Sequence, residues 1–362
     1  MQMISKRSPR AAKATMTDVA QLAGVSAATV ARALYKNGYV KEETRQAVEA
    51  AVAATGYRLN SLARGLRTSR SFTLGLVVSE PQPSAFHVQT ANVVQLEALK
   101  LGYTVLTLNN HGDAAMEAAG VRRFLDDRAD AVIFCAAIDP ANVRLIERSG
   151  IPTVQIERQV ALVGGLVLPD AEQGMREAVD HLYALGHRDF AYIGGVGHFD
   201  LMEGPKSEAV EPKRERLFLE SVARHGLSVP PAYVRRGAYY IDGGQRGQPG
   251  HELVKALLEL RPRPTALICG SDLLAAFALQ AISEAGLRVP TDISVIGYDG
   301  VLAEILTPPL SSIAQPIEEL GRLAVEMAVA AIDDPNATLQ PCVIPTRLLL
   351  RESTGNAPAG GP

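Results

Sequence analysis

Hydrophobic residues recur at helical spacing in three short segments near the N-terminus. The first has an apolar face over residues 19–23 and stops at Gly24, with Thr17 as its predicted N-cap. Ser26 can cap a second helix two residues later, and a third helix is predicted over about 42–56. A short helix, a tight turn containing glycine and a second helix form the helix-turn-helix arrangement. The third helix completes one small core.

Beyond residue 71 the pattern changes to short apolar runs that alternate with amphipathic stretches. The runs predict strands over 72–78, 103–108, 131–135, 153–156, 166–168, 190–195, 265–269 and 293–299. Helical patterns between them cover 93–101, 117–125, 141–148, 174–185 and 273–285. Near-continuous apolar strands that alternate with helices predict parallel sheets covered on both faces. Because so many strands exceed one comfortable open sheet, we expect two α/β lobes with a cleft between them.

Length and composition are those of an ordinary folded protein with more than one domain. The chain has 362 residues, of which 47% are hydrophobic and 21% charged. No window approaches about 18 uninterrupted apolar residues, and the basic N-terminus lacks the apolar stretch of a secretory signal. We therefore expect no membrane span and a cytoplasmic location. Cys135, Cys269 and Cys342 lie far apart in apolar stretches, which predicts small buried side chains rather than disulfides or a zinc site.

The charge is divided unevenly along the chain. Residues 1–70 carry 12 Lys and Arg against four acidic residues, a net charge of +8. The remainder carries 24 basic and 35 acidic residues, a net charge of −11. Such asymmetry indicates that the N-terminal region binds a polyanion and that the rest of the chain does not. A solvated basic tail would give the same charge, so the pattern within the segment must decide.

The motifs within the N-terminal segment are specific enough to decide between these two interpretations. Residues 16–71 contain DVA-xx-AGVS-xx-TV-x-R, then V-xxx-TR-xx-V, then GY-xx-N-xx-AR-x-L. At these spacings the segment resembles the headpiece and hinge of the lactose-repressor (LacI/GalR) family of bacterial transcription regulators. The resemblance continues through LGHRDFAYIGG, GLRVPTDISVIGYDG, PPLSSIAQPIEELG and IPTRLLLREST, and so covers nearly the whole chain. It implies an all-α helix-turn-helix headpiece followed by a two-lobed α/β effector domain like that of periplasmic binding proteins.

Composition and resemblance together divide the chain into five parts. The expected parts are a basic disordered arm (1–15), a helix-turn-helix domain (16–59), a hinge helix (60–71), an effector-binding and dimerisation domain (72–354) and a flexible tail (355–362). Within the effector domain, lobe 1 is expected to comprise about 72–169 and 315–343, and lobe 2 about 170–314 and 344–354.

The resemblance implies contacts with double-stranded operator DNA. The base-reading positions are Ala27, Ala28 and Arg32. The phosphate contacts are Thr17, Ser26 and Thr29. An arginine in the major groove can donate two hydrogen bonds to guanine, worth about 1–3 kcal/mol of discrimination, whereas the alanines offer only apolar contact. Simple helix capping is an equally good role for Thr17.

The hinge positions that match the family are Asn60, Ala63, Arg64 and Leu66. Leu66 is expected to wedge between base pairs in the minor groove, which costs a few kcal/mol of unstacking and is offset by the contacts that the kink brings. Leucine is more often a core residue. The neighbouring arginines argue against burial of this face in a protein core.

The cleft positions that match the family are Glu157, Arg214, Ser271, Asp299 and Gln315. Asp299 ends a predicted strand at the edge where open α/β sheets bind ligands. The resemblance implies a small-molecule effector, a sugar or sugar derivative, gripped at its hydroxyls, and Arg214 could instead bind a ligand anion. The competing interpretation of the charged residues is an exposed salt bridge.

The sequence disfavours two other classes of protein. The chain has no G-x-x-x-x-G-K-[ST], G-x-S-x-G or H-E-x-x-H, so an enzyme is disfavoured, and no catalytic residue, metal or cofactor is expected. A solute-binding protein would need an export signal and would lack the basic N-terminal region. We therefore expect an effector-controlled transcription regulator, a repressor. It is expected to be a homodimer, because one helix-turn-helix headpiece contacts only a few base pairs.

Overall fold

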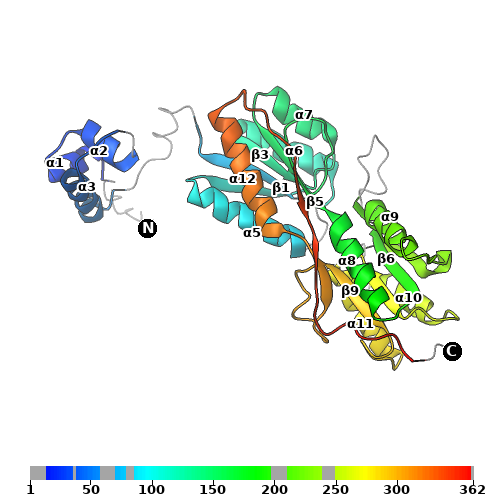
Figure 1. Ribbon diagram of the computed structural model, residues 1–362. Helices are drawn as coiled ribbons and strands as arrows, with labels where there is room; N and C mark the ends of the chain where they lie inside the picture. Colours follow the sequence, from blue (N-terminus) through cyan, green and yellow to red (C-terminus); the bar gives the residue numbers. More distant parts are fainter. Residues whose placement is uncertain are drawn as a thin grey trace, which may run out of the picture. The chain divides into compact units, whose positions relative to one another are not determined.

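A computed structural model describes residues 14–35, 38–57, 70–78, 85–196, 210–238 and 249–359 of the chain (Figure 1). The chain divides into two compact units, residues 1–70 and residues 71–362. Hinge residues Asn60, Ala63, Arg64 and Leu66 lie outside the described residues, as does most of the expected basic arm.

The N-terminal unit is a three-helix bundle around one apolar core. Its helices are α1 (Met16–Ala23), α2 (Ala27–Tyr35) and α3 (Glu42–Thr55). Each contributes one fully buried valine, namely Val19, Val30 and Val48. Gly24 ends α1 with a φ of 65°, a left-handed conformation that costs glycine little, and so permits the tight turn into α2. The predicted helix-turn-helix is therefore confirmed.

The prediction that Thr17 caps the first helix is wrong, because the N-cap is Thr15. The Asp18 N–H donates to Thr15 Oγ1 at 3.3 Å, while the Thr15 N–H donates to Asp18 Oδ2 at 2.7 Å. This reciprocal capping box satisfies two backbone N–H groups at once, which Thr17 cannot do. Thr17 instead lies exposed in the first turn. The predicted cap of the second helix is present, since the Thr29 N–H donates to Ser26 Oγ at 3.1 Å.

The larger unit contains two six-stranded sheets, which define its first and second lobes. The first sheet has the order β11-β5-β4-β3-β1-β2 and all its paired strands are parallel. Its strands are β1 (Thr73–Val78), β2 (Thr104–Asn109), β3 (Ala131–Cys135), β4 (Thr153–Ile156), β5 (Gly165–Asp170) and β11 (Cys342–Pro345). The second sheet has the order β12-β10-β9-β8-β6-β7, with only β12 antiparallel to its neighbour. Its strands are β6 (Phe190–Val196), β7 (Val234–Ala238), β8 (Ala266–Cys269), β9 (Ser294–Asp299), β10 (Ser311–Ala314) and β12 (Arg347–Leu349).

Helices cover both faces of each sheet, as the apolar strands predicted. In the first lobe, α5 (Ala85–Lys100) and α12 (Ile317–Asp333) lie side by side on one face (Figure 1). The opposite face carries α6 (Ala114–Asp126) and α7 (Pro140–Arg148). In the second lobe, α8 (Ala171–Ala184) and α9 (Val210–Ala223) cover one face. On the other lie α10 (Pro249–Leu258) and α11 (Asp272–Glu284), and a short 3-10 helix, η2 (Pro231–Tyr233), precedes β7.

Alternation along one strand shows why both faces need helices. Phe190 and Tyr192 of β6 pack towards α8 and α9, whereas Ala191 and Ile193 pack towards α10 and α11. All four are at most 2% exposed. Successive side chains point to opposite faces, so a strand buried on both sides must be apolar throughout. The predicted fold class, a helix-turn-helix headpiece with a two-lobed α/β domain, is confirmed.

The chain passes between the lobes three times, after β5, after β10 and between β11 and β12. Two of these crossings are joined, because the Thr346 N–H and Oγ1–H both donate to the Asp170 carbonyl, at 2.9 and 2.8 Å. At the remaining crossing, the Gln315 N–H donates to the Asp299 carbonyl at 3.2 Å. Any movement of one lobe against the other must therefore act on these three segments.

The tail predicted to be flexible over 355–362 is held in place over its described part. The Gly355 N–H donates to Ser294 Oγ at 3.0 Å, the Gly355 carbonyl lies 3.0 Å from His187 Nε2, and the Ala357 N–H donates to the Leu185 carbonyl at 2.8 Å. His187 and Ser294 are fully buried and need such partners. The expectation of a mobile segment is therefore wrong for 355–359.

Two of the three cysteines are buried as predicted. Cys135 and Cys269 lie in central strands, whereas Cys342 is only partly buried because β11 is an edge strand of the first sheet. None of the three forms a disulfide.

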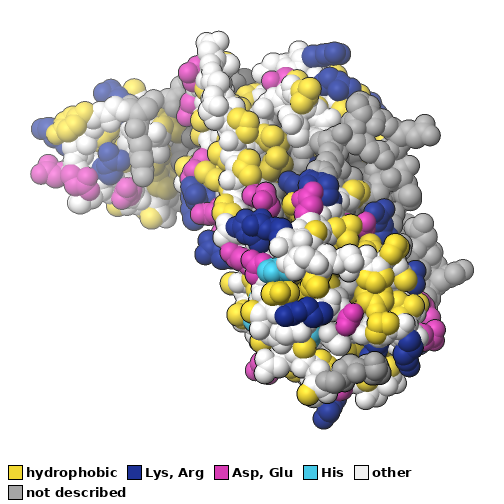
Figure 2. Space-filling model, turned by 45° about the vertical axis from the view of Figure 1, so that its right-hand side comes forward, with side chains coloured by type: hydrophobic (Ala, Val, Ile, Leu, Met, Phe, Trp, Pro, Cys, Tyr) yellow, Lys and Arg dark blue, Asp and Glu magenta, His cyan; other side chains and the backbone are white. Residues whose placement is uncertain are grey.

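Hydrophobic side chains also reach the surface of the larger unit, interspersed with charged ones (Figure 2). A group of them lies on α5. Its members, between 51% and 70% exposed, are Val88, Leu96 and Leu99. No helix in the described ranges combines the length and the hydrophobicity needed to cross a membrane.

Candidate functional site

The predicted base-reading residues lie together on the outer side of α2. Ala27 and Ala28 begin the helix, and Arg32 follows Ala28 by one helical turn, so these two share a face. All three side chains are exposed, whereas Val30 and Ala33 on the same helix are buried in the bundle core. The helix is thus anchored by one side and accessible on the other.

The predicted phosphate contacts also lie at helix starts. Ser26 Oγ and Thr29 Oγ1 are 2.9 Å apart, and Ser26 also accepts the Thr29 N–H. Both hydroxyls therefore already take part in capping α2. Thr17 has no capping role and its side chain is exposed on α1.

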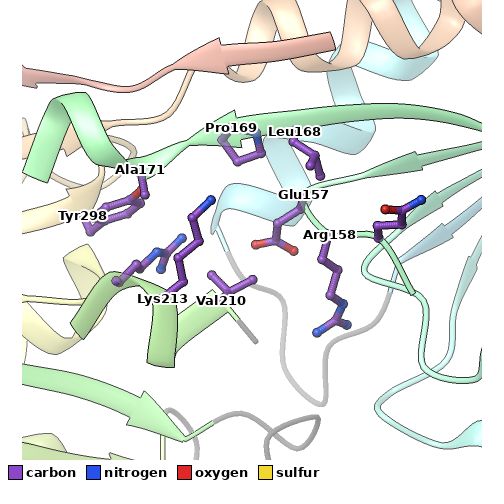
Figure 3. Close-up of a pocket in the computed structure, with 10 residues that line it drawn as sticks. Glu157, Arg158, Leu168, Pro169, Ala171, Val210, Lys213 and Tyr298 are labelled. Atoms are coloured by element: carbon purple, nitrogen blue, oxygen red, sulfur yellow. The ribbon is translucent and has the colours of Figure 1, made fainter. Parts of the chain in front are cut away.

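A second candidate site is a cleft between the two lobes of the larger unit, enclosing about 720 Å³ including its open side. It is lined by Glu157, Arg158, Gln159, Leu168, Pro169, Ala171, Val210, Lys213, Arg214 and Tyr298 (Figure 3). Several lining residues follow or end parallel strands: Glu157 comes directly after β4, and Leu168 and Pro169 lie near the end of β5. Ligands of open α/β sheets bind at this edge because loops diverge there.

Glu157 is paired with His87 of α5. Glu157 Oε2 lies 3.1 Å from His87 Nε2, and the two side chains are 10% and 8% exposed. Burial raises the pKa of Glu157, but His87, with Arg158 and Arg214, outweighs it and lowers the pKa from 4.5 to about 2. Burial likewise opposes charge on His87, yet Cys135 and Glu157 raise its pKa well above 6.5. At neutral pH the pair is a carboxylate beside an imidazolium.

Arg214 connects three parts of the second lobe. Its Nη1–H donates to the Gly270 carbonyl at 2.8 Å, its Nη2 lies 3.9 Å from Asp299 Oδ1, and its guanidinium stacks 3.8 Å above the centre of the Tyr298 ring. The residue is 5% exposed. The stacked ring and the carbonyl fix the orientation of the guanidinium, which is what precise recognition of a ligand requires.

Asp299 lies beside Arg214 and Gln315. The Gln315 Nε2–H donates to Asp299 Oδ1 at 2.7 Å, while Gln315 Oε1 is buried and has no hydrogen-bond partner among the described residues. Burial raises the pKa of Asp299 to about 7, although Arg214 acts to lower it; Asp272 and Glu157 raise it further. A buried acceptor without a partner is costly, so Gln315 Oε1 is suited to receive a ligand hydroxyl.

Two of these carboxylates sit on strained backbone. Glu157 has a φ of 73° and Asp299 a φ of 97°, values that non-glycine residues rarely adopt. Such positions cost about 1–3 kcal/mol each and cluster at ligand sites, where the surrounding structure enforces them. The strain therefore supports a functional role for both side chains.

Ser271 has a structural role in the described residues. Its hydroxyl oxygen accepts the Leu274 N–H at 3.1 Å and caps α11, and the residue is 7% exposed. It adjoins Gly270, the partner of Arg214. Of the five predicted cleft residues, Glu157 and Arg214 line the cleft, and Asp299 and Gln315 join the polar cluster around Arg214.

Sequence reasoning missed His87, Arg158 and Lys213. His87 lies 70 residues before its partner Glu157 and no motif marks it. Arg158 and Lys213 each adjoin a residue that was predicted, Glu157 and Arg214, so position next to a predicted contact was the available signal.

Comparisons with known proteins agree with this arrangement. The model for bacterial regulatory proteins of the lacI family matches residues 15–60, and that for a periplasmic binding protein-like domain matches 179–354. The transcriptional repressor PurR of Pectobacterium atrosepticum is 30% identical over 350 residues, covering 95% of this chain and 98% of its own. The ribose operon repressor of Escherichia coli (strain K12) is 30% identical over 348 residues, covering 94% and 99%. The solved lac repressor dimer, bound to operator and the anti-inducer ONPF, has a TM-score of 0.75 and 26% identity over 95% of this chain and all of that one.

A helix-turn-helix unit and a two-lobed binding unit in a single chain define a transcription regulator whose DNA binding is coupled to a ligand. The similarity extends over both units. The chain belongs to the lacI family of bacterial regulatory proteins.

Proposed function

We propose that this protein is a cytoplasmic repressor that binds a pseudo-palindromic operator as a homodimer and responds to a small effector, a sugar or sugar derivative, in the inter-lobe cleft. One observation carries the proposal: the same chain has an exposed α2 face with Arg32 and a cleft where Glu157, Arg214 and Asp299 gather. The relatives PurR and the ribose operon repressor are named as repressors, which supports the direction of control.

The DNA-binding step requires an exposed helix face and phosphate contacts beside it. Arg32 would donate to guanine O6 and N7, with Ala27 and Ala28 against neighbouring base edges. Ser26, Thr29 and Thr17 would contact phosphates, and Leu66 of the hinge would wedge into the minor groove, with Asn60, Ala63 and Arg64 beside it. The experiment is selection of bound duplexes from random DNA by the full chain. A recurrent two-fold related sequence is expected, and recovery of unrelated sequences would contradict the proposal.

The effector would bind among the polar groups of the cleft. Glu157, Asp299 and Gln315 Oε1 supply acceptors for hydroxyl groups, and Arg214 supplies donors held by the Tyr298 ring. Because the cleft lies between lobes joined only by three crossings, a ligand that contacts both lobes favours one arrangement of them. A coupling of about 1–3 kcal/mol would change operator affinity about 5- to 150-fold.

The Asp299→Ala variant tests this site. It should keep the operator affinity of the wild type and lose the response to the effector found by screening metabolites on the selected duplex. Asp126→Ala is the matched control, since Asp126 is exposed at the end of α6, away from the cleft. A full response in Asp299→Ala would remove that residue from the site.

The homodimer is supported by the exposed apolar group on α5. Val88, Leu96 and Leu99 recur at helical spacing on the side of α5 that faces away from its own core. The similar lac repressor was solved as a dimer. We propose that a second copy of the chain covers this surface. Light scattering should show a dimer for the wild type and a monomer for Leu99→Glu, whereas Leu162→Glu, at a loop leucine that is 90% exposed, should remain dimeric. A dimeric Leu99→Glu would place the interface elsewhere.

A further inference from the structure

The end of the chain is held on the edge of the second sheet that lies opposite the cleft. β6, β8 and β9 are parallel neighbours, and His187, Thr265 and Ser294 stand at or just before their N-terminal ends. Residues 353–359, which form the C-terminal latch, contact His187 and Ser294 (the red end of the chain in Figure 1). The cleft lies at the other end of these strands, where β9 ends at Asp299.

His187 is fully buried and uses both ring nitrogens. Its Nε2 lies 3.0 Å from the Gly355 carbonyl oxygen, which can only accept, so Nε2 carries the hydrogen. Its Nδ1 lies 2.9 Å from Thr265 Oγ1 and accepts the threonine hydroxyl when the ring is neutral. A charged ring has a hydrogen on both nitrogens and loses the bond from Thr265. The latch is therefore satisfied by neutral His187.

Ser294 joins the same two partners. Its Oγ accepts the Gly355 N–H at 3.0 Å, donates to the Gly355 carbonyl at 3.2 Å and lies 3.0 Å from His187 Nε2. Ser294 is fully buried, and a Cβ at position 355 would lie only 3.2 Å from the Pro290 side chain. The latch thus packs so closely against the lobe that its polar groups depend on these partners.

A second histidine contacts the neighbouring residue of the latch. His181, in the last turn of α8, has its Nε2 3.0 Å from Thr354 Oγ1, and Thr354 Oγ1 lies 3.3 Å from Ser311 Oγ of β10. Farther along, the Ala357 N–H donates to the Leu185 carbonyl at 2.8 Å. Two adjacent latch residues therefore each contact one histidine.

The surroundings of both rings disfavour a positive charge. Burial lowers the pKa of His187; the Gly355 carbonyl opposes this shift, whereas His181 and Arg188 add to it. Both of these ionisable neighbours are basic, and the groups that meet the ring from the starts of β8 and β9 and from the latch are neutral hydroxyls and a carbonyl. Burial also lowers the pKa of His181. Both rings are therefore neutral at pH 7 when the latch is closed.

We propose that the C-terminal latch is a pH-sensitive switch, closed on neutral His187 and His181 and released when they are protonated. In the released chain both rings regain the usual histidine pKa of about 6.5, higher than in the closed state. The released state binds protons more readily, so acid favours release and the latch is fully closed only above about pH 6.5. For His187 alone, the ratio of closed to released chains falls up to about tenfold between pH 6.5 and 5.5.

Release would also act on the third crossing between the lobes. Thr346 at this crossing donates to the Asp170 carbonyl, and the chain then runs through β12 into the latch. β12 pairs with β10 over three residues. Opening the latch shortens the stretch of chain that anchors this crossing to the second lobe. The switch thereby loosens the connection between the lobes in acid.

Hydrogen–deuterium exchange of the full chain at pH 7.5 and 5.5, corrected for the effect of pH on intrinsic exchange, measures release. The Gly355 and Ala357 amides report it, because their hydrogen bonds belong to the closed latch. In the wild type their protection should fall several-fold at pH 5.5, up to about tenfold from His187 alone, relative to amides of β3 in the first lobe. The Thr346 amide should lose protection in the same direction.

Three variants with the same substitution assign the effect. His187→Gln keeps an N–H donor for the Gly355 carbonyl and cannot be protonated, so its latch should stay protected at pH 5.5. His181→Gln, at a partly buried site, should reduce the loss and is the second variant if His187→Gln fails to fold. His225→Gln is the matched control: His225 pairs with Asp180 at the surface, and this variant should lose protection as the wild type does.

Two results would overturn the proposal. One is equal protection of the Gly355 and Ala357 amides at both pH values in the wild type. The other is a loss in His187→Gln and His181→Gln as large as that in His225→Gln. Unchanged exchange at Thr346 while the latch is released would contradict the link to the third crossing. Neither DNA nor an effector is needed, so the outcome is independent of the proposed regulator function.

Discussion

Replacing Asp299 by asparagine should remove a pH-dependent loss of stability. Burial, against the opposing effect of Arg214, raises the pKa of Asp299 from 3.8 to about 7 in the folded protein. The folded state therefore holds this proton more tightly than the unfolded chain, and the wild type loses stability as the pH rises from about 4 through 7. The Asn side chain is close to the protonated carboxyl in shape and has no charge to desolvate.

The magnitude follows from the difference between the two pKa values. Each pH unit between them is worth about 1.4 kcal/mol, so the interval from pH 5 to pH 7 accounts for about 3 kcal/mol. The free energy of unfolding of Asp299→Asn, relative to that of the wild type, should thus increase by about 3 kcal/mol between pH 5 and pH 8. The Glu157 carboxyl, with its pKa near 2, stabilises the fold above its usual 4.5 and loses this effect only as the pH falls through 2, outside this window.

Urea unfolding of the wild type and of Asp299→Asn at pH 5, 6, 7 and 8 measures the effect. The comparison cancels His87, whose stabilisation is present below 6.5 and is lost in both proteins as the pH rises through its raised pKa. Asp126→Asn, at an exposed acid of α6, is the matched control. Parallel curves for the wild type and Asp299→Asn across the range would refute the assigned burial and proton affinity of this carboxyl.

Four further substitutions test the N-terminal unit and the hinge. Thr15→Ala removes the capping box and should cost about 1 kcal/mol in thermal unfolding, whereas Thr17→Ala should cost little; the reverse order would restore Thr17 as the cap. Arg32→Ala should relax preference at one base position of the selected duplex by about 1–3 kcal/mol in competition binding, and an unchanged preference would exclude its base contact. Leu66→Ala should weaken specific binding and spare non-specific association in a salt titration, so equal losses of both would argue against the minor-groove wedge.

The fold was largely predictable because apolar periodicity is strong where burial is complete. The eight predicted strands are present, whereas β7, β10, β11 and β12 were not predicted. These four are short, and three lie at sheet edges, where one side of the strand has no neighbour. An edge strand needs no continuous apolar run, so its sequence resembles a loop.

Local chemistry explains two of the corrections, those of the helix cap and of the tail. Thr15 and Thr17 both precede apolar positions, and only the Thr15–Asp18 spacing forms a reciprocal cap. The tail around Gly355 has the composition of a mobile segment, yet its backbone satisfies His187 and Ser294 of the second lobe. Sequence composition does not reveal a distant buried group that needs a partner.

The cleft was predictable only as far as the resemblance reached. Glu157, Arg214, Asp299 and Gln315 gather as members of one polar region, but the assignment of Ser271 as a ligand contact competes with its role as the cap of α11. The His87–Glu157 pair joins residues 70 positions apart, so it can be recognised only in the folded structure.

The most direct test is the affinity of the full chain for its selected duplex and for the same bases in scrambled order, measured at physiological salt. Control of specific DNA binding requires a preference of at least about 1,000-fold for the selected duplex. Equal affinity for the two duplexes would mean that the α2 face does not read sequence, and the protein would not be the regulator proposed.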